Sequence, residues 1–123
     1  DVFSQQWRFR DADELIHSWP GKAFDECDAG ADDAVAAITH NEGMDDEAVA
    51  EALRRSCFYV GVLGGRDTQK KRRQRLRDMG FTQRETERIH GPIGLDLGAA
   101  SPEEIALSIA AELVAEYRKR NGR

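Results

Sequence analysis

Residues 89–112 read IHGPIGLDLGAASPEEIALSIAAE, a loop punctuated by glycine and proline that runs directly into a helix. The start of this helix is strongly specified. Ser101 can cap the first amides, Pro102 suits the first helical position because its missing N–H is not needed there, and Glu104 completes a Ser-x-x-Glu capping box. A helix that begins so firmly fixes the loop before it, and loops held on a rigid scaffold often carry function.

The loop itself contains one carboxylate, Asp96, between Gly94 and Gly98. Glycines allow the backbone to take positive φ angles or to approach a ligand closely. Two interpretations follow. Either Asp96 is presented to a ligand, or the loop is a tight structural connection in which Asp96 bonds its own backbone.

Outward from this stretch, helical and extended patterns alternate, which predicts an α/β layer structure. Continuous apolar runs at residues 34–39 and 57–63 predict two buried strands. Between them Asp45 is the predicted cap of a helix, and a second helix is expected over residues 67–79. Residues 14–18, just before a Trp-Pro-Gly turn, are a candidate edge strand.

The two longest predicted helices carry different surfaces. The terminal helix has an apolar stripe expected to pack on the sheet; it consists of Ile105, Ile109, Leu113 and Tyr117. The helix at residues 67–79 is crowded with Lys and Arg, and only Leu76 and Met79 supply an apolar stripe. Because no aromatic side chains are interleaved for base stacking, we interpret its cations as a solvated face, with a phosphate-bearing or acidic partner as the alternative.

A glycine turn, Gly64-Gly65-Arg66, joins the predicted strand at 57–63 to the basic helix. Such a turn exposes free amides at the positive end of a helix, which favours anions. In open parallel sheets, ligands bind at the carboxyl ends of the strands, where His40 also lies. We therefore predict one concave binding site; its residues are His40, Gly64, Gly65, Arg66, Gly94 and Asp96. The alternative is a tight turn without a ligand.

The chemistry expected of that site is binding rather than catalysis. His40 can donate to a ligand or exchange a proton, and it can equally cap the following turn. No Ser-His-Asp order, metal-ligand helix or paired-carboxylate motif accompanies it. Cys27 and Cys57 lack the spacing of a zinc site, and Cys57 is expected to be a small core residue.

Composition indicates one small domain of 123 residues, with 40% hydrophobic and 33% charged residues. A formal net charge of −5 gives no overall attraction to nucleic acid or to an anionic membrane. No apolar run approaches the roughly 20 residues that span a bilayer, and no signal peptide is recognisable. These features predict a cytoplasmic protein.

Several segments in a specific order make the chain resemble the C-terminal domain of the XdhC/CoxI family, the accessory proteins of xanthine and carbon monoxide dehydrogenases. The resemblance covers most of the chain. The segments that carry it are ITH at 38–40, YVGVLGGR at 59–66, MGF at 79–81, RIH at 88–90, PIGLDLGA at 92–99, SPEEIA at 101–106 and SIAAE at 108–112.

The resemblance implies a Rossmann-like three-layer α/β sandwich with a mostly parallel sheet, formed by residues 1–123 as a single, partial domain. Family members have an earlier strand, a Gly-x-Gly turn and a second strand that this sequence does not match; residues 1–9 resemble the segment just downstream. The expectation is therefore a truncated domain: a fragment, a split gene product or a natural truncation. Gly65 is a second departure, because the family usually has Ser there, whose hydroxyl can bond a ligand.

By the same resemblance, the expected function is that of a maturation factor for molybdenum hydroxylases. Such a factor binds molybdenum cofactor (molybdopterin, a phosphorylated pterin) transiently and delivers it to the apo-enzyme. The alternatives are an NAD(P)-dependent oxidoreductase or nucleotide-binding domain, by fold analogy alone, and a remnant that binds nothing. With no dinucleotide fingerprint in the sequence, we expect no redox chemistry.

The family architecture also implies an oligomer. If the missing strands lie at the centre of the sheet, the strand at residues 34–39 has an unpaired edge. A homodimer is predicted, formed by pairing of these edges or by exchange of residues 1–18. The alternative is a monomer in which the N-terminal segment covers the edge.

Overall fold

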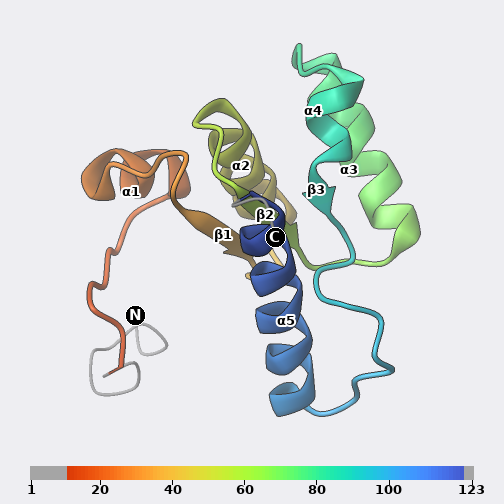
Figure 1. The fold of residues 1–123 in the computed structure, drawn as a ribbon. Coiled ribbons are helices and arrows are strands. Elements are labelled where there is room, and N and C mark those ends of the chain that lie inside the picture. The colour runs from red at the N-terminus through yellow and green to blue at the C-terminus, as the bar shows by residue number, and fades with distance from the viewer. Residues whose placement is uncertain (1–10, 121–123) are drawn as a thin grey trace.

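The computed structural model describes residues 11–120, which form five helices and three strands in alternating layers (Figure 1). In chain order these are α1 (Pro20–Cys27), β1 (Ala34–Ala37), α2 (Glu42–Arg54), β2 (Tyr59–Val62), α3 (Arg66–Asp78), α4 (Gln83–Glu87), β3 (Ile89–His90) and α5 (Pro102–Arg120). Predictions that fall on residues 1–10, including exchange of the N-terminal segment, lie largely outside the described residues.

The described strands form one parallel sheet in the order β1-β2-β3. Val35 pairs with Val60 in β2, and Val60 pairs with Ile89 in β3. All four residues of β2 are buried, as expected for the central strand of a parallel sheet covered on both faces. The sequence analysis missed β3, because two residues are too short to show a period of two.

Successive side chains of β2 point to opposite faces of the sheet. Val60 and Val62 join the apolar core formed with α2 and with Leu76 of α3. Tyr59 points to the other face, where its hydroxyl bonds Glu112 of α5, and Figure 1 shows α5 running across that face. The structure is therefore a three-layer α/β sandwich with a parallel sheet, and the predicted fold class is confirmed.

The predicted edge strand at residues 14–18 is wrong, because this segment is extended without pairing to a neighbour. The turn expected after it is instead the start of α1, in which Pro20 occupies a first-turn position. Side chains of α2 and its C-cap hold α1 in place. Glu47 accepts a bond from the amide of Gly21 at 2.8 Å, and Arg55 donates to backbone carbonyls at the end of α1.

Helix starts agree with the sequence where both capping partners are local. The capping boxes Thr82–Glu85 and Ser101–Glu104 both form. Asp45 is not a cap, because Asn41 accepts the bond from the Met44 amide and α2 begins at Glu42. Asp45 is instead buried, and its Oδ1 accepts from the Thr39 hydroxyl at 2.7 Å.

Both strands are shorter than predicted, and α3 begins one residue earlier, with Gly65 as its N-cap. The interpretation of α3 as a solvated helix is wrong at Arg72, which is buried. Asp46 of α2 accepts from Arg72 Nε at 2.6 Å and from Arg75 Nε at 2.8 Å. Met79, expected in the apolar stripe, is 58% exposed because the chain turns away at Gly80.

The orientation of α5 also differs from the prediction. Ile105 and Tyr117, expected against the sheet, are exposed, and Ser108 is the one fully buried residue among those described in this helix. Ser108 and Glu112 face inward because both accept hydrogen bonds from the backbone of the loop before the helix. Polar contacts to that loop, rather than the most apolar stripe, therefore set the rotation of α5.

Candidate functional site

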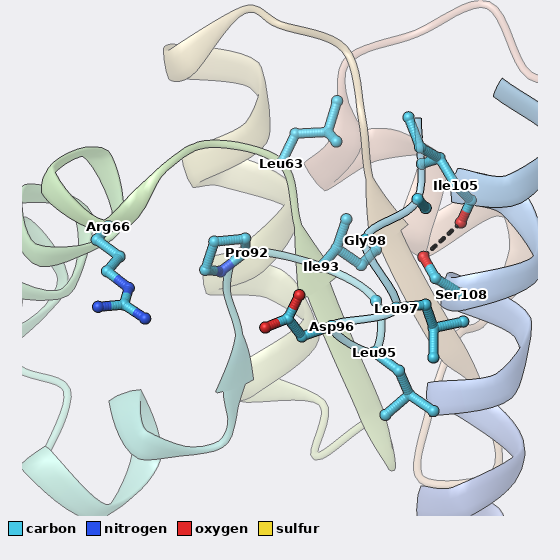
Figure 2. Close-up of a pocket in the computed structure, with 12 residues that line it drawn as sticks. Leu63, Arg66, Pro92, Ile93, Leu95, Asp96, Leu97, Gly98, Ile105 and Ser108 are labelled. Atoms are coloured by element: carbon cyan, nitrogen blue, oxygen red, sulfur yellow. Dashed lines mark hydrogen bonds between the residues drawn. The ribbon is translucent and has the colours of Figure 1, made fainter. Parts of the chain in front are cut away.

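A cavity of about 520 Å³ opens at the carboxyl end of β2, between the sheet and α5 (Figure 2). Leu63, which follows β2, and Arg66, the first residue of α3, line one side of it. The loop of residues 92–99 and two residues of α5, Ile105 and Ser108, line the rest. This is the sheet edge at which the sequence predicted a site, and the volume is that of a small-molecule pocket.

Two charged side chains line this otherwise largely apolar cavity, Arg66 and Asp96. Figure 2 shows the carboxylate of Asp96 turned toward the side on which Arg66 lies, with Pro92 between them. Within residues 11–120, neither side chain has an ion-pair partner or a hydrogen bond, so Asp96 does not bond its own loop. A guanidinium can bind an anionic group, and a carboxylate can accept from ring or amine N–H groups.

The loop is anchored through three consecutive amides. Ile93 N donates to Val62 O at 3.0 Å, Gly94 N to Glu112 Oε1 at 2.9 Å, and Leu95 N to Ser108 O at 3.1 Å. The Gly94 amide is thus committed to the protein and is not a donor for a ligand. The backbone requires glycine there, since φ is +95° and an added Cβ would lie 2.4 Å from Ser108 Oγ.

A second, smaller cavity of about 170 Å³ lies beside the first, and Leu63 lines both. His40 and Gly64 line the small cavity, together with Thr68 and Arg72. The sequence predicted one rim for all six candidate residues. The structure divides them: the large cavity has Arg66, Gly94 and Asp96, the small cavity has His40 and Gly64, and Gly65 lines neither. Leu63 separates the groups because it contributes to both walls.

His40 is exposed and occupies the left-handed region, with φ at 66°. Its neighbours hold the turn, since the Thr39 hydroxyl accepts from the Asn41 amide at 3.0 Å and donates to Asp45 at 2.7 Å. The cap of α2 is Asn41, so the alternative in which His40 caps the turn is wrong. His40 is left with an imidazole facing the small cavity.

The turn between β2 and α3 depends on Gly64, whose φ is +120° and whose added Cβ would lie 2.9 Å from Thr68 Cγ2. Gln69 supports the turn by donating to the carbonyls of Leu63 and Gly64 at 2.8 and 3.0 Å. Gly65 provides no side-chain cap for the first amides of α3. These amides and the Arg66 guanidinium place positive charge at this end of the helix.

Directly behind the loop lies a polar cluster that the sequence analysis did not single out. Tyr59 Oη donates to Glu112 Oε1 at 2.7 Å, and the Tyr59 ring stacks on His90 with a centroid separation of 4.9 Å. Burial, and next the bond to Glu112, raise the pKa of Tyr59 above its ordinary value. These residues come from β2, β3 and α5, so no local motif identifies the cluster.

Residues 11–120 contain no group of three His, Cys, Asp or Glu side chains placed to hold a metal ion. Over the same range, no helix combines the length and apolarity that crossing a bilayer would need. Cys57 is buried in the core, as the sequence predicted, and burial raises the pKa of its thiol. Cys27 is exposed, and neither cysteine forms a disulfide.

A parallel sheet whose central strand leads through a glycine turn into a helix, with a pocket at the carboxyl edge, defines a Rossmann-type ligand-binding domain. Comparison with known families gives the particular one. The model described as the XdhC Rossmann domain matches residues 1–113. The chain belongs to the XdhC family, and the resemblance found in the sequence is confirmed.

Relatives with names agree with this assignment. The chain is 30% identical over 112 residues to a Bacillus subtilis protein named as a probable xanthine dehydrogenase component, covering 91% of this chain and 32% of the relative. It is 30% identical over 99 residues to the molybdenum cofactor insertion chaperone PaoD of Escherichia coli, covering 80% of this chain and 30% of PaoD.

A solved structure has the same fold. The crystal structure of a xanthine dehydrogenase from Bacillus halodurans superimposes with a TM-score of 0.78 at 30% identity, covering 95% of this chain and 33% of that one. The chain thus spans about a third of the length of each of these relatives.

Proposed function

We propose that this domain serves in the maturation of molybdenum hydroxylases of the xanthine or carbon monoxide dehydrogenase type. In this proposal it binds molybdenum cofactor transiently and passes it to the apo-enzyme. The relative named as a molybdenum cofactor insertion chaperone supports the cargo. The observation that carries the proposal is the cavity lined by Arg66 and Asp96, two opposite charges without partners among the described residues.

The chemistry of the cavity suits a phosphorylated pterin. Arg66, at the positive end of α3, would hold the phosphate, and Asp96 would accept from N–H groups of the pterin ring. Apolar walls from Leu63 and the loop would cover the ring faces. His40, Gly64 and Gly65 border the adjoining turn, while Gly94 contributes through the backbone shape of the loop. Binding and release need no nucleophile, so the proposed role is that of a binding protein.

Ligand binding by variants tests this proposal. Native mass spectrometry and calorimetry would compare molybdopterin with NADH and NADPH on the intact chain. Arg66→Ala and Asp96→Asn are each expected to weaken molybdopterin binding roughly 10- to 100-fold, the loss typical of one charged hydrogen bond. Arg84→Ala, at an exposed position on α4, is the matched control and should bind normally. Saturable NADH or NADPH binding without molybdopterin binding would favour the oxidoreductase instead.

We further propose that the partner is a molybdenum hydroxylase apo-enzyme and that the chain forms a homodimer in the cytoplasm. The dimer is supported by β1, which is an edge strand of the described sheet with exposed Ala34, Ala36 and Ile38 along it. Light scattering at micromolar concentration should give a dimer mass, and Ala36→Pro should reduce it to a monomer. A monomeric wild-type chain would contradict the dimer, and cell fractionation tests the location.

A further inference from the structure

The polar cluster behind the ligand loop is centred on one carboxylate. Glu112 Oε1 accepts two hydrogen bonds, from Tyr59 Oη at 2.7 Å and from Gly94 N at 2.9 Å. Its second oxygen lies 3.4 Å from His90 Nδ1. The Glu112 side chain is only 13% exposed. A carboxylate this far from solvent is retained at low cost only where donors satisfy it, and here donors from β2, the loop and β3 all do so.

Of the three amide anchors of the loop, one alone depends on a side chain. The bonds from Ile93 and Leu95 end on backbone carbonyls, whereas the bond from Gly94 ends on Glu112. Gly94 is also where the loop takes a positive φ, and Asp96 follows two residues later. Because the Asp96 side chain has no hydrogen bond of its own within the described residues, its place in the cavity depends on this anchor.

We infer that Glu112 is a positioning residue for the ligand loop: its carboxylate fixes Gly94 and thereby sets where Asp96 meets a ligand. The inference rests on the proposed function for its consequence, since Asp96 is there a ligand-binding group. Glu112 itself does not line the cavity and need not touch the ligand.

The neighbours of Glu112 keep it in place. Tyr59 is buried and remains a protonated donor at neutral pH because burial raises its pKa. The His90 ring stacks on Tyr59, and its Nε2 lies 3.7 Å from Glu116 Oε1, one helical turn after Glu112. Glu116 thus shares the helix, the charge and the histidine with Glu112 but has no bond to the loop among the described residues. It is a matched control.

Three substitutions separate reach from charge. Glu112→Gln retains an oxygen that can accept from Tyr59 and Gly94, Glu112→Asp retains the charge but withdraws it by one methylene, and Glu112→Ala removes both. We expect amide hydrogen exchange at Gly94 to accelerate at least about tenfold in the Asp and Ala variants, a change equivalent to losing one hydrogen bond. The Gln variant should remain within about threefold of wild type, as should Glu116→Ala.

Molybdopterin affinity, measured by calorimetry, should follow the same order. The Asp and Ala variants should bind roughly tenfold more weakly and the Gln variant normally, while the amides of Val60 and Val62 remain protected in all of them. Unchanged exchange at Gly94 in Glu112→Asp, or equal acceleration in Glu116→Ala, would overturn the inference. If wild type does not bind molybdopterin, the proposed function fails, and the exchange data still decide whether Glu112 holds the loop. If the Ala variant does not fold, the Asp and Gln pair decides.

Discussion

Arg72 of α3 and Asp46 of α2 form an ion pair with an Nε–Oδ1 distance of 2.6 Å, in which the arginine side chain is only 2% exposed and the aspartate 22%. Arg75 donates to the same carboxylate. The Arg72 guanidinium also donates to the carbonyl of Leu63 at the end of β2. One carboxylate therefore connects two helices to the strand that leads into the candidate site.

Replacing Asp46 with Ala should destabilise the domain by about 3 kcal/mol, because Arg72 would stay buried without its counter-charge. Urea unfolding followed by circular dichroism measures the change. Asp78→Ala, which loses a single exposed contact to Gln74, is the control and should change stability by less than about 0.5 kcal/mol. Equal effects of the two substitutions would contradict the structural role of the pair.

The two glycines before α3 should respond in opposite ways to substitution by alanine. Gly64→Ala should destabilise by about 1–3 kcal/mol, because φ is +120° and the added Cβ meets Thr68. Gly65→Ala should be neutral or stabilising, since its φ is −71° and no atom lies within 4 Å of the added Cβ. Thermal unfolding of both variants tests this contrast.

Serine at position 65 should stabilise the start of α3. Gly65 is the N-cap and has extended backbone angles, so a hydroxyl there can accept from an amide of the first turn. Gly65→Ser is expected to gain a few tenths of a kcal/mol relative to Gly65→Ala. A serine variant less stable than the alanine variant in thermal unfolding would show that the hydroxyl does not cap the helix.

The capping box of α5 should lose its contribution in acid. Glu104 accepts from the amides of Ser101 and Ala100, and these bonds lower its pKa below the usual glutamate value of about 4.3. Its stabilisation is therefore complete above that value and disappears as the pH falls through the lowered pKa. Glu104→Gln should flatten the acid limb of the stability curve, measured by urea unfolding from pH 6 to pH 3. An unchanged slope would contradict this assignment.

The two thiols should react at different rates. Cys27 is exposed, whereas Cys57 is buried and its pKa is raised by that burial. An aromatic disulfide reagent at pH 8 should titrate one thiol in the native chain and two in denaturant. Rapid reaction of both native thiols would show that the core around Cys57 opens readily.

The sequence by itself determined the features whose causes are local. The capping boxes at Thr82 and Ser101 were predictable because both partners lie within four residues. The buried strand β2 was predictable from its apolar run, and the α/β class from the alternation of patterns. Arg66 and Asp96 were predictable as site residues at the level of place, because strand ends and glycine turns lie at the same edge of a parallel sheet.

Only the tertiary structure decided the features that depend on residues far apart in the chain. Arg72 is buried because Asp46, 26 residues earlier, faces it. The helix α5 turns Ser108 and Glu112 inward because the loop backbone and Tyr59 need acceptors there. The division of the predicted site into two cavities follows from the position of Leu63. Hydrogen-bond satisfaction inside the fold, which no local pattern encodes, made these choices.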